Sequence, residues 1–152
     1  MKDMPIEVLR QNFRQAPFIA SLGLELASIG AGECTTRLDV RPDHLQQNGV
    51  VHAGVLATLA DHTAGAAAFT TLAPGSYPLT VEFKLNLLRP ATGPTLRCTA
   101  RVLKAGARLV VVESEVLADA TSPARLCAKA TVTLAVLTAG EAGQTPPPRG
   151  GG

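Results

Sequence analysis

The 152-residue chain carries a formal net charge of +2, and 46% of its residues are hydrophobic, so its length suits one domain with a sizeable core. Basic and acidic residues are interspersed, and the chain has no tryptophan and a single tyrosine, which argues against nucleic acid as a partner. The cysteines Cys34, Cys98 and Cys127 are widely spaced and form no CxxC pair, which argues against a disulfide framework or a zinc site.

The N-terminal part is predicted to form a helix and a hairpin. Residues 5–21 place apolar side chains on one side of a helix, and Pro17 is expected to break or bend it. Residues 22–30 and 33–40 have the patterning of two strands. The start of the chain is amphipathic rather than basic and then apolar, and no run approaches the ~20 apolar residues of a membrane span. We therefore expect a cytoplasmic protein that makes no membrane contact.

A helix over residues 52–72 is predicted at the centre of the fold, because it is apolar nearly all round. The hydrophobic period then changes to two, which predicts strands over residues 77–89, 95–104, 108–118 and 125–137. These elements predict an α+β fold in which a curved antiparallel sheet wraps around one long helix, although the pattern alone leaves several topologies open. We expect one domain over residues 1–138 and a mobile Pro/Gly-rich tail over residues 139–152.

Asp61 is an unusual residue for the centre of this helix, since it is the only formal charge between residues 44 and 81. On a helix it shares its face with small residues, among them Ala57, Ala64 and Gly65. A buried carboxylate is costly unless it is hydrogen-bonded or used, so we expect a functional site beside this face. A structural aspartate satisfied by a neighbouring hydroxyl, or a chance burial without function, are the alternatives.

The start of the same helix offers a second polar feature at His52, Ala53 and Gly54. The unpaired N–H groups of a first helical turn suit a carbonyl oxygen that gains negative charge, and small residues there permit close approach. The helix rise separates this turn from Asp61 by about 13 Å, which is too far for both to act on one carbonyl. If both serve one reaction, they come from different subunits.

The run HAG at residues 52–54, with Gly49 before it and Asp61 nine residues after His52, resembles the HGG-x6-D signature of hotdog-fold thioesterases of the phenylacetate-degradation (PaaI) type. The resemblance extends over residues 22–137 and includes the segment TVEFKLNLLRPATG after the helix. It implies a hotdog fold and hydrolysis of an acyl-CoA thioester, with no metal and no cofactor beyond the coenzyme A of the substrate. It also implies a homodimer with two sites at the subunit interface, and leaves open a tetramer of two such dimers.

The resemblance also implies roles for individual residues. Asp61 matches the carboxylate that acts as nucleophile or general base. Ala53 matches the residue whose backbone N–H polarises the thioester carbonyl, and its methyl group replaces the usual glycine. Gln46 holds the place of an amide that donates to the same carbonyl or orients the water. Thr80 matches a hydroxyl near the carboxylate, and His52 matches a residue that shapes the loop.

Two of these assignments depend on local register. Strand alternation groups Thr80 with Glu82 on one face, so Thr80 reaches Asp61 only if the strand begins or bulges suitably. Asn48 is a second amide close to Gln46, and a shift of register would exchange their roles. The substrate contacts that we expect are Asn48, Gly54, Ala57, Ala64, Gly65 and Arg89, the last of these toward the phosphates of coenzyme A.

The remaining histidines and two other functions complete the predictions. His44 is expected on a loop surface and His62 against a neighbour, and the three histidines lack the spacing of a metal site. A hotdog hydratase or dehydratase is disfavoured, because the motifs G-D-x-N-P-x-x-H and H-F-P-x-x-P-x-x-P-G are missing. The alternative is a non-catalytic acyl-CoA-binding protein of the same fold, although this chain has no room for the DNA-binding helical module of such regulators.

Overall fold

A computed structural model describes residues 6–138, with side chains from residue 10 onwards. The helices are α1 (Ile6–Arg14), α2 (Pro17–Leu22) and α3 (Ala53–Phe69), and a 3₁₀ turn, η1 (Pro42–His44), precedes α3. The strands are β1 (Glu25–Gly30), β2 (Glu33–Asp39), β3 (Ser76–Leu87), β4 (Thr95–Ala105), β5 (Leu109–Ala118) and β6 (Arg125–Thr138).

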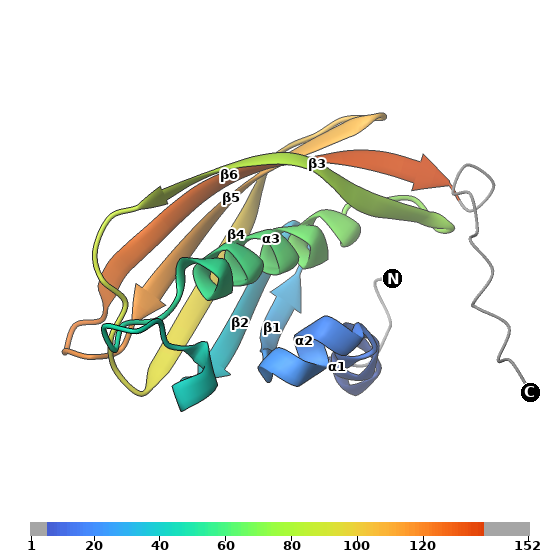
Figure 1. Ribbon diagram of the computed structural model, residues 1–152. Helices are drawn as coiled ribbons and strands as arrows, with labels where there is room; N and C mark the ends of the chain where they lie inside the picture. The colour runs from blue at the N-terminus through green and yellow to red at the C-terminus, as the bar shows by residue number, and fades with distance from the viewer. Residues whose placement is uncertain (1–5, 139–152) are drawn as a thin grey trace, which may run out of the picture.

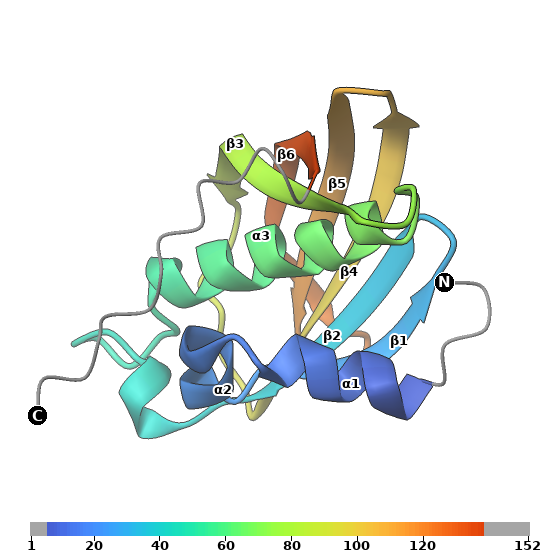
Figure 2. The ribbon, with the colours of Figure 1, turned by 90° about the vertical axis from the view of Figure 1, so that its right-hand side faces the viewer.

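The strands form one antiparallel sheet in the order β1-β2-β4-β5-β6-β3. This sheet curves around α3, and α1 and α2 lie next to β1 on the same side of the sheet as α3 (Figures 1 and 2). The predicted α+β architecture, a curved antiparallel sheet around one long helix, is confirmed. In this order β3 lies at an edge of the sheet, and its one neighbour is β6, the last strand of the chain.

Helix α3 is apolar nearly all round because the sheet covers one side of it while α1 and α2 lie beside another. Small side chains allow it to approach the sheet closely, and fully buried leucines fill the remaining space. Burying one leucine contributes about 1.5–3 kcal/mol to stability. The buried residues of the helix are Val55, Leu56, Leu59, Ala60, Thr63, Ala64, Ala67 and Ala68.

Two buried hydroxyl contacts fix the rotation of α3 against the sheet. Thr36 on β2 and Thr63 on α3 share a hydrogen bond of 2.7 Å between their hydroxyl oxygens. The Ser114 hydroxyl on β5 donates to the carbonyl oxygen of Ala60 at 2.8 Å. Both contacts lie on the face of α3 toward the sheet, so they determine which residues the helix presents on its other faces.

The N-terminal helical segment is broken, which is one of the two outcomes predicted for Pro17. The structure has two helices within the range predicted over residues 5–21, and Pro17 begins the second of them. The break therefore occurs at the proline, as expected from its missing N–H and fixed φ. Helix α2 then ends at Gly23, whose φ of +80° is a left-handed conformation that favours glycine.

Helix α3 is shorter at its C-terminal end than the predicted range of residues 52–72. It ends at Phe69, and the hydroxyls of Thr70 and Thr71 donate to the carbonyls of Ala67 and Ala68. The backbone N–H groups of Thr70 and Thr71 bond the same two carbonyls, so backbone and side chain together end the helix here.

The six observed strands overlap the six predicted ones. The proposed tail over residues 139–152 lies outside the described residues. Within residues 6–138, no helix is long and apolar enough to cross a membrane.

The shared hydrogen bond of Thr36 and Thr63 gives a test of this packing. Thr36→Val should lower the free energy of unfolding by about 1–3 kcal/mol, because the Thr63 hydroxyl loses its buried partner. The double variant Thr36→Val/Thr63→Val should recover most of that loss, since both polar groups are replaced by methyl groups of similar shape. Urea unfolding measures both values. A double variant whose losses simply add would contradict the pairing.

Candidate active site around Asp61

Asp61 lies in the middle of α3, half-buried, with its carboxylate directed toward β3. Its Oδ1 accepts a hydrogen bond of 2.7 Å from the Thr80 hydroxyl. The strand pairing explains how Thr80 reaches it, because the register with β6 shifts between Thr80 and Glu82. A bulge of this kind changes the direction of a side chain without ending the strand. Strand alternation alone would not direct Thr80 toward Asp61. The sequence predicted this contact only if β3 began or bulged suitably, and the bulge is present.

The second oxygen of this carboxylate, Oδ2, has no hydrogen-bond partner among residues 6–138. Asp61 borders two neighbouring grooves, so a ligand in either one can approach it. The pair of Asp61 and Thr80 is called the carboxylate half-site below. A carboxylate with one oxygen held by a hydroxyl and the other available can attack a carbonyl carbon or accept a proton from water.

The larger of the two grooves, named the apolar groove here, has a volume of about 460 Å³. It runs from the carboxylate half-site along the C-terminal half of α3, between the N-terminal helices, β1 and the start of β3. The residues that line it are Asn12, Phe13, Ala16, Leu26, Ile29, Asp61, His62, Gly65, Ala66, Phe69, Pro78, Leu79, Thr80 and Leu134.

The second groove at Asp61, named the side groove here, has a volume of about 420 Å³. Its lining residues are Ala16, Phe18, Ile19, Ala57, Thr58, Asp61, His62 and Phe83. Ala16, Asp61 and His62 belong to both grooves, so the two volumes meet along these side chains.

A third groove lies at the start of α3 and has a volume of about 440 Å³. It is named the helix-start groove, and Gln46, His52, Ala53 and Arg89 are among its lining residues. His52 is the N-cap of α3, where its Nδ1 accepts the Gly54 N–H at 2.8 Å. Since that cap occupies the Gly54 donor, the Ala53 N–H has no hydrogen-bond partner within residues 6–138.

The Gln46 side chain supplies a second donor in the helix-start groove. Its Oε1 accepts the backbone N–H of Asn48, which leaves the amide NH₂ available to donate. Gln46 and Ala53 form the donor half-site, in which two N–H groups border the same groove. Asn48 itself is exposed and does not line the groove, and its backbone N–H holds the Gln46 side chain.

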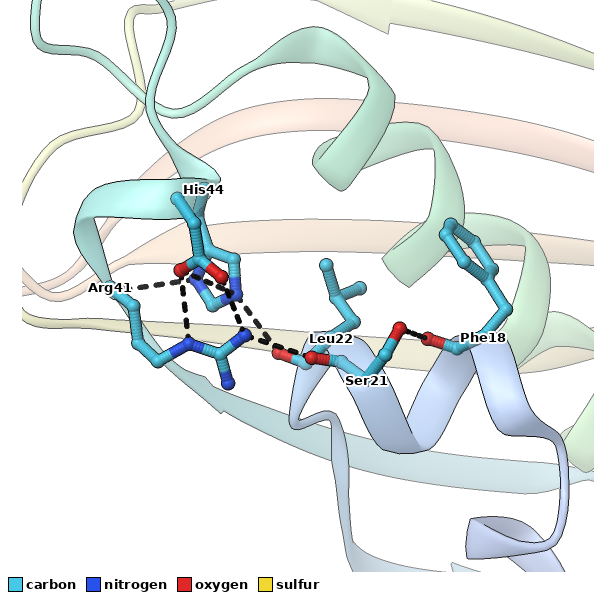
Figure 3. A network of polar contacts seen from close by, with 6 residues as sticks. Phe18, Ser21, Leu22, Arg41 and His44 are labelled. Atoms are coloured by element: carbon cyan, nitrogen blue, oxygen red, sulfur yellow. Dashed lines mark hydrogen bonds and ion pairs between the residues drawn. The ribbon is translucent and has the colours of Figure 1, made fainter.

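A polar network fixes the loop that carries Gln46 (Figure 3). His44 Nδ1 accepts the backbone N–H of Arg41 at 3.0 Å, and the ring's Nε2 donates to the carbonyl of Leu22 at 2.9 Å. The Arg41 guanidinium donates to the Ser21 carbonyl and to the Asp43 carboxylate, and it holds the pKa of Asp43 below its usual value. This network ties the loop to the C-terminal end of α2.

The burial of His44 corrects a prediction. His44 was expected on a loop surface, but it is 1% exposed. Both of its ring nitrogens are hydrogen-bonded to backbone groups, one to the N–H of Arg41 and one to the carbonyl of Leu22, so it is a structural residue. Its main partner, the Leu22 carbonyl, lies 22 residues away in sequence, and no local pattern marks that pairing.

The carboxylate half-site and the donor half-site lie far apart in this chain. Ala53 and Asp61 are eight positions apart on α3, which is about 12 Å at the standard helix rise. No residue lines both the helix-start groove and the grooves at Asp61. One chain therefore presents two separate halves.

The expected substrate contacts divide among these regions. Ala57 lines the side groove, Gly65 lines the apolar groove, and Arg89 lines the helix-start groove while its guanidinium donates to the Leu126 carbonyl at 3.0 Å. Gly54 is exposed beside its capped N–H. Ala64 corrects the expectation, because it is completely buried against the sheet and borders none of these grooves.

His62 packs edge-on against Phe13, with ring centroids 4.5 Å apart, which confirms the expected contact with a neighbour. Burial lowers the pKa of His62 and outweighs the opposite influence of Asp61. The sequence did not indicate that His62 also lines both grooves at Asp61, because that placement depends on where α1 and α2 pack.

Other nucleophiles and metal ligands do not gather at these grooves. All three cysteines are buried, and burial raises the pKa values of Cys34 and Cys98 to about 12, so they remain neutral thiols. Within the part of the chain that the structure describes, no group of three His, Cys, Asp or Glu residues could hold a metal ion.

Comparisons with known proteins relate the region around Asp61 to thioesterases. Residues 48–123 match the Thioesterase superfamily, a range that includes Asp61 and Thr80. A thioesterase family protein from Silicibacter pomeroyi is 32% identical, with a TM-score of 0.83 over 88% of this chain and 98% of that chain. A variant of the phenylacetic acid degradation protein PaaI from Thermus thermophilus is 26% identical, with a TM-score of 0.71 over 80% of this chain and 99% of that chain.

A hypothetical thioesterase from Streptococcus pneumoniae, whose structure includes coenzyme A, has a TM-score of 0.74 over 84% of this chain and 96% of that chain. Its sequence is 21% identical, so this likeness concerns the fold alone.

The His52 cap can be tested by its effect on stability. His52→Ala should lower the free energy of unfolding by about 1 kcal/mol, because the Gly54 N–H loses its acceptor. His52→Asn is the matched control, since asparagine is a favoured N-cap and restores an acceptor oxygen. Thermal or urea unfolding measures both. Equal losses for the two variants would show that His52 stabilises the loop by some contact other than this cap.

Proposed function

Because this chain belongs to the thioesterase superfamily, we propose that it hydrolyses an acyl-CoA thioester to a free acid and coenzyme A. The observation that carries the proposal is the hydrogen bond of 2.7 Å between the Thr80 hydroxyl and Asp61, which orients a carboxylate at the mouth of an apolar groove. The PaaI likeness and the spacing of His52 and Asp61 support a site of the phenylacetate-degradation type.

In the proposed mechanism the thioester carbonyl oxygen accepts hydrogen bonds from the Ala53 N–H and the Gln46 amide of one subunit. These donors stabilise the negative charge that develops as the carbonyl carbon becomes tetrahedral. The N-terminal position of Ala53 on α3 adds the positive end of the helix dipole. The acyl group extends into the apolar groove of the other subunit, whose hydrocarbon lining suits a medium chain or a ring.

Asp61 of that other subunit acts by one of two routes. As a nucleophile, its carboxylate oxygen attacks the carbonyl carbon, the C–S bond breaks, and water then hydrolyses the mixed anhydride. As a general base, it takes a proton from water, hydroxide adds to the carbonyl carbon, and the thiolate that leaves receives the proton. In the second route Thr80 helps to place the water. A burst of thiol release before the acid appears would favour the anhydride route.

We further propose that the chain works as a homodimer paired through β3. This edge strand and its continuation expose apolar side chains whose exposed fractions lie between 43% and 56%, and such an edge is rarely left uncovered. The exposed residues are Leu79, Val81, Phe83, Leu87 and Leu88. A two-fold antiparallel pairing centred on Phe83 would place Glu82 opposite the partner's Lys84, so the charges also complement one another.

The hydrolysis proposal is tested with a panel of aliphatic and aromatic acyl-CoAs, by following release of free thiol. Asp61→Asn should lower kcat by about 10²–10⁴-fold, because an amide is neither a base nor a competent nucleophile. Thr80→Val should lower it by about 10–100-fold, the kinetic equivalent of one hydrogen bond to a charged group.

Thr80→Ser keeps the hydroxyl and is the matched control, so its activity should stay near that of the natural chain. Release of no thiol from any thioester, with acyl-CoA still bound, would instead favour the non-catalytic alternative. Equal rates for Asp61→Asn and the natural chain would remove Asp61 from the mechanism.

The shared site is tested by mixing two inactive variants. Ala53→Pro removes the N–H donor without breaking the helix, because proline is well tolerated at the first position of a helix and the extended φ and ψ of His52 suit a following proline. A random mixture of Ala53→Pro and Asp61→Asn subunits should regain about a quarter of the natural activity. Half of its dimers are mixed, and each mixed dimer has one of its two sites intact.

Each variant alone should stay inactive at the same total concentration. No recovery after subunit exchange would contradict a site divided between subunits. Sedimentation of the natural chain measures the assembly directly and also distinguishes a dimer from a tetramer.

A further inference from the structure

The His44 ring is buried just before the segment that carries Gln46, and the proposed mechanism gives it no part. Its exposed fraction is 1%, and it does not line the helix-start groove that the described residues form. A substrate in that groove therefore does not touch the ring. Any influence of His44 on the reaction must pass through its neighbours in the chain.

The two ring nitrogens of His44 make contacts of opposite sense. Nδ1 accepts the Arg41 N–H at 3.0 Å, and Nε2 donates to the Leu22 carbonyl at 2.9 Å (Figure 3). A neutral imidazole with its proton on Nε2 satisfies both partners at once. The Arg41 contact is local, whereas the Leu22 carbonyl belongs to the end of α2. The ring therefore connects the segment that follows it to a different element of the fold.

Residues 44–52, named the Gln46 loop here, are held together by their own backbone. The Gln46 N–H donates to the Val50 carbonyl at 2.9 Å, and the Gln46 carbonyl accepts the Gly49 N–H at 2.9 Å. Its side-chain Oε1 accepts the N–H of Asn48. These contacts fix the shape of the loop around Gln46, but they do not fix where the loop lies against the rest of the chain.

Contacts at the two ends of the Gln46 loop fix that position. At the far end the Val51 N–H donates to the Ala91 carbonyl at 2.9 Å. At the near end the buried contact is the one made by the His44 ring. Gln46 lies two residues from His44 and five from Val51, so the direction of its amide NH₂ depends most on the near end. The Ala53 N–H belongs to the first turn of α3, and the helix itself holds it.

We propose that His44 is a positioning residue for the reaction, whose ring holds the Gln46 amide where it donates to the thioester carbonyl. The proposal rests on the proposed acyl-CoA hydrolysis. A histidine suits this role because one rigid, neutral ring supplies an acceptor and a donor in different directions. The ring touches no substrate, and its effect on the rate passes through Gln46.

The first measurement is kcat for the acyl-CoA that the natural chain hydrolyses best. His44→Leu replaces the ring by hydrocarbon and should lower kcat by about 10–100-fold, because a displacement of about 1 Å can cost 10²-fold. KM should change by less than about threefold, since the Gln46 amide acts on charge that develops in the transition state. Circular dichroism checks that the variant is folded at the assay temperature.

A double-mutant cycle separates positioning from a general loss of stability. Gln46→Ala alone should lower kcat by about 10²-fold, as expected for the loss of one oxyanion donor. Adding His44→Leu to Gln46→Ala should lower kcat by no more than about threefold further, because the group through which the ring acts is already gone. Equal losses from His44→Leu in both backgrounds would overturn the proposal.

Two conservative variants keep one ring contact each, and they serve in place of His44→Leu where that variant does not fold. In His44→Gln the amide nitrogen can donate to the Leu22 carbonyl, and in His44→Asn the amide oxygen can accept the Arg41 N–H. His44→Gln should retain more activity, because it keeps the contact that leaves the loop. A higher kcat for His44→Asn would overturn the role given to the Leu22 contact.

The matched control is Arg41→Ala, which keeps the backbone N–H that bonds His44. It removes the exposed guanidinium contacts with the Ser21 carbonyl and with Asp43. Exposed contacts of this kind contribute little, so kcat should stay within about threefold of that of the natural chain. A loss as large as that of His44→Leu would assign the anchoring to the guanidinium and overturn the role of the ring.

The outcomes also separate this inference from the proposed function. Hydrolysis at the natural rate by a folded His44→Leu variant would overturn the role of His44 and leave the thioesterase proposal standing. Hydrolysis of no acyl-CoA by the natural chain would overturn both.

Discussion

The arrangement of the site depends on one hydrogen bond, from the Thr80 hydroxyl to the carboxylate of Asp61. Helix α3 must be apolar to fill a sheet that curves around it, and a carboxylate in such a helix needs a partner or a function. The bulge in β3 supplies the partner, because it turns Thr80 toward the helix while β3 and β6 continue to pair on both sides of the bulge. The same bond leaves the other oxygen of Asp61 available at the edge of two grooves.

The small side chains of α3 permit close packing on one face of the helix and leave open space on another. Where they face the sheet, as Ala60 and Ala64 do, they let helix and sheet approach closely and are completely buried. Where they face away, they leave space. A methyl group added at Gly65 would meet only the side chain of Leu134, at 3.9 Å, so the volume beside Asp61 exists partly because this position has no side chain. Orientation, set by the hydroxyl contacts to β2 and β5, decides which alanine packs and which residue lines a groove.

Much of this fold could be predicted from the sequence, because hydrophobic period is a local property. Period two marked the strands, an apolar helix marked the centre, and Pro17 marked the break between α1 and α2. The position of Asp61 stood out for the same reason, as an isolated charge in an apolar run. What the sequence could not supply depends on contacts between distant segments. Thr80 reaches Asp61 only through a bulge in the pairing of β3 with β6. The buried ring of His44 is held by the carbonyl of Leu22, 22 residues away in sequence.

The distance between the two ends of the site along α3 is the physical reason for the proposed homodimer. The donor half-site uses backbone and amide N–H groups at the N-terminal end of the helix, where the dipole favours negative charge. The carboxylate half-site cannot share that end, because a negative side chain beside the same donors would occupy them in place of the substrate's carbonyl oxygen. About two helical turns keep the two halves apart within one chain. An antiparallel partner reverses the direction of the helix, so the donors of one copy can approach the carboxylate of the other. In the proposed dimer, the separation that keeps Asp61 away from the donors of its own chain is therefore bridged by the second copy.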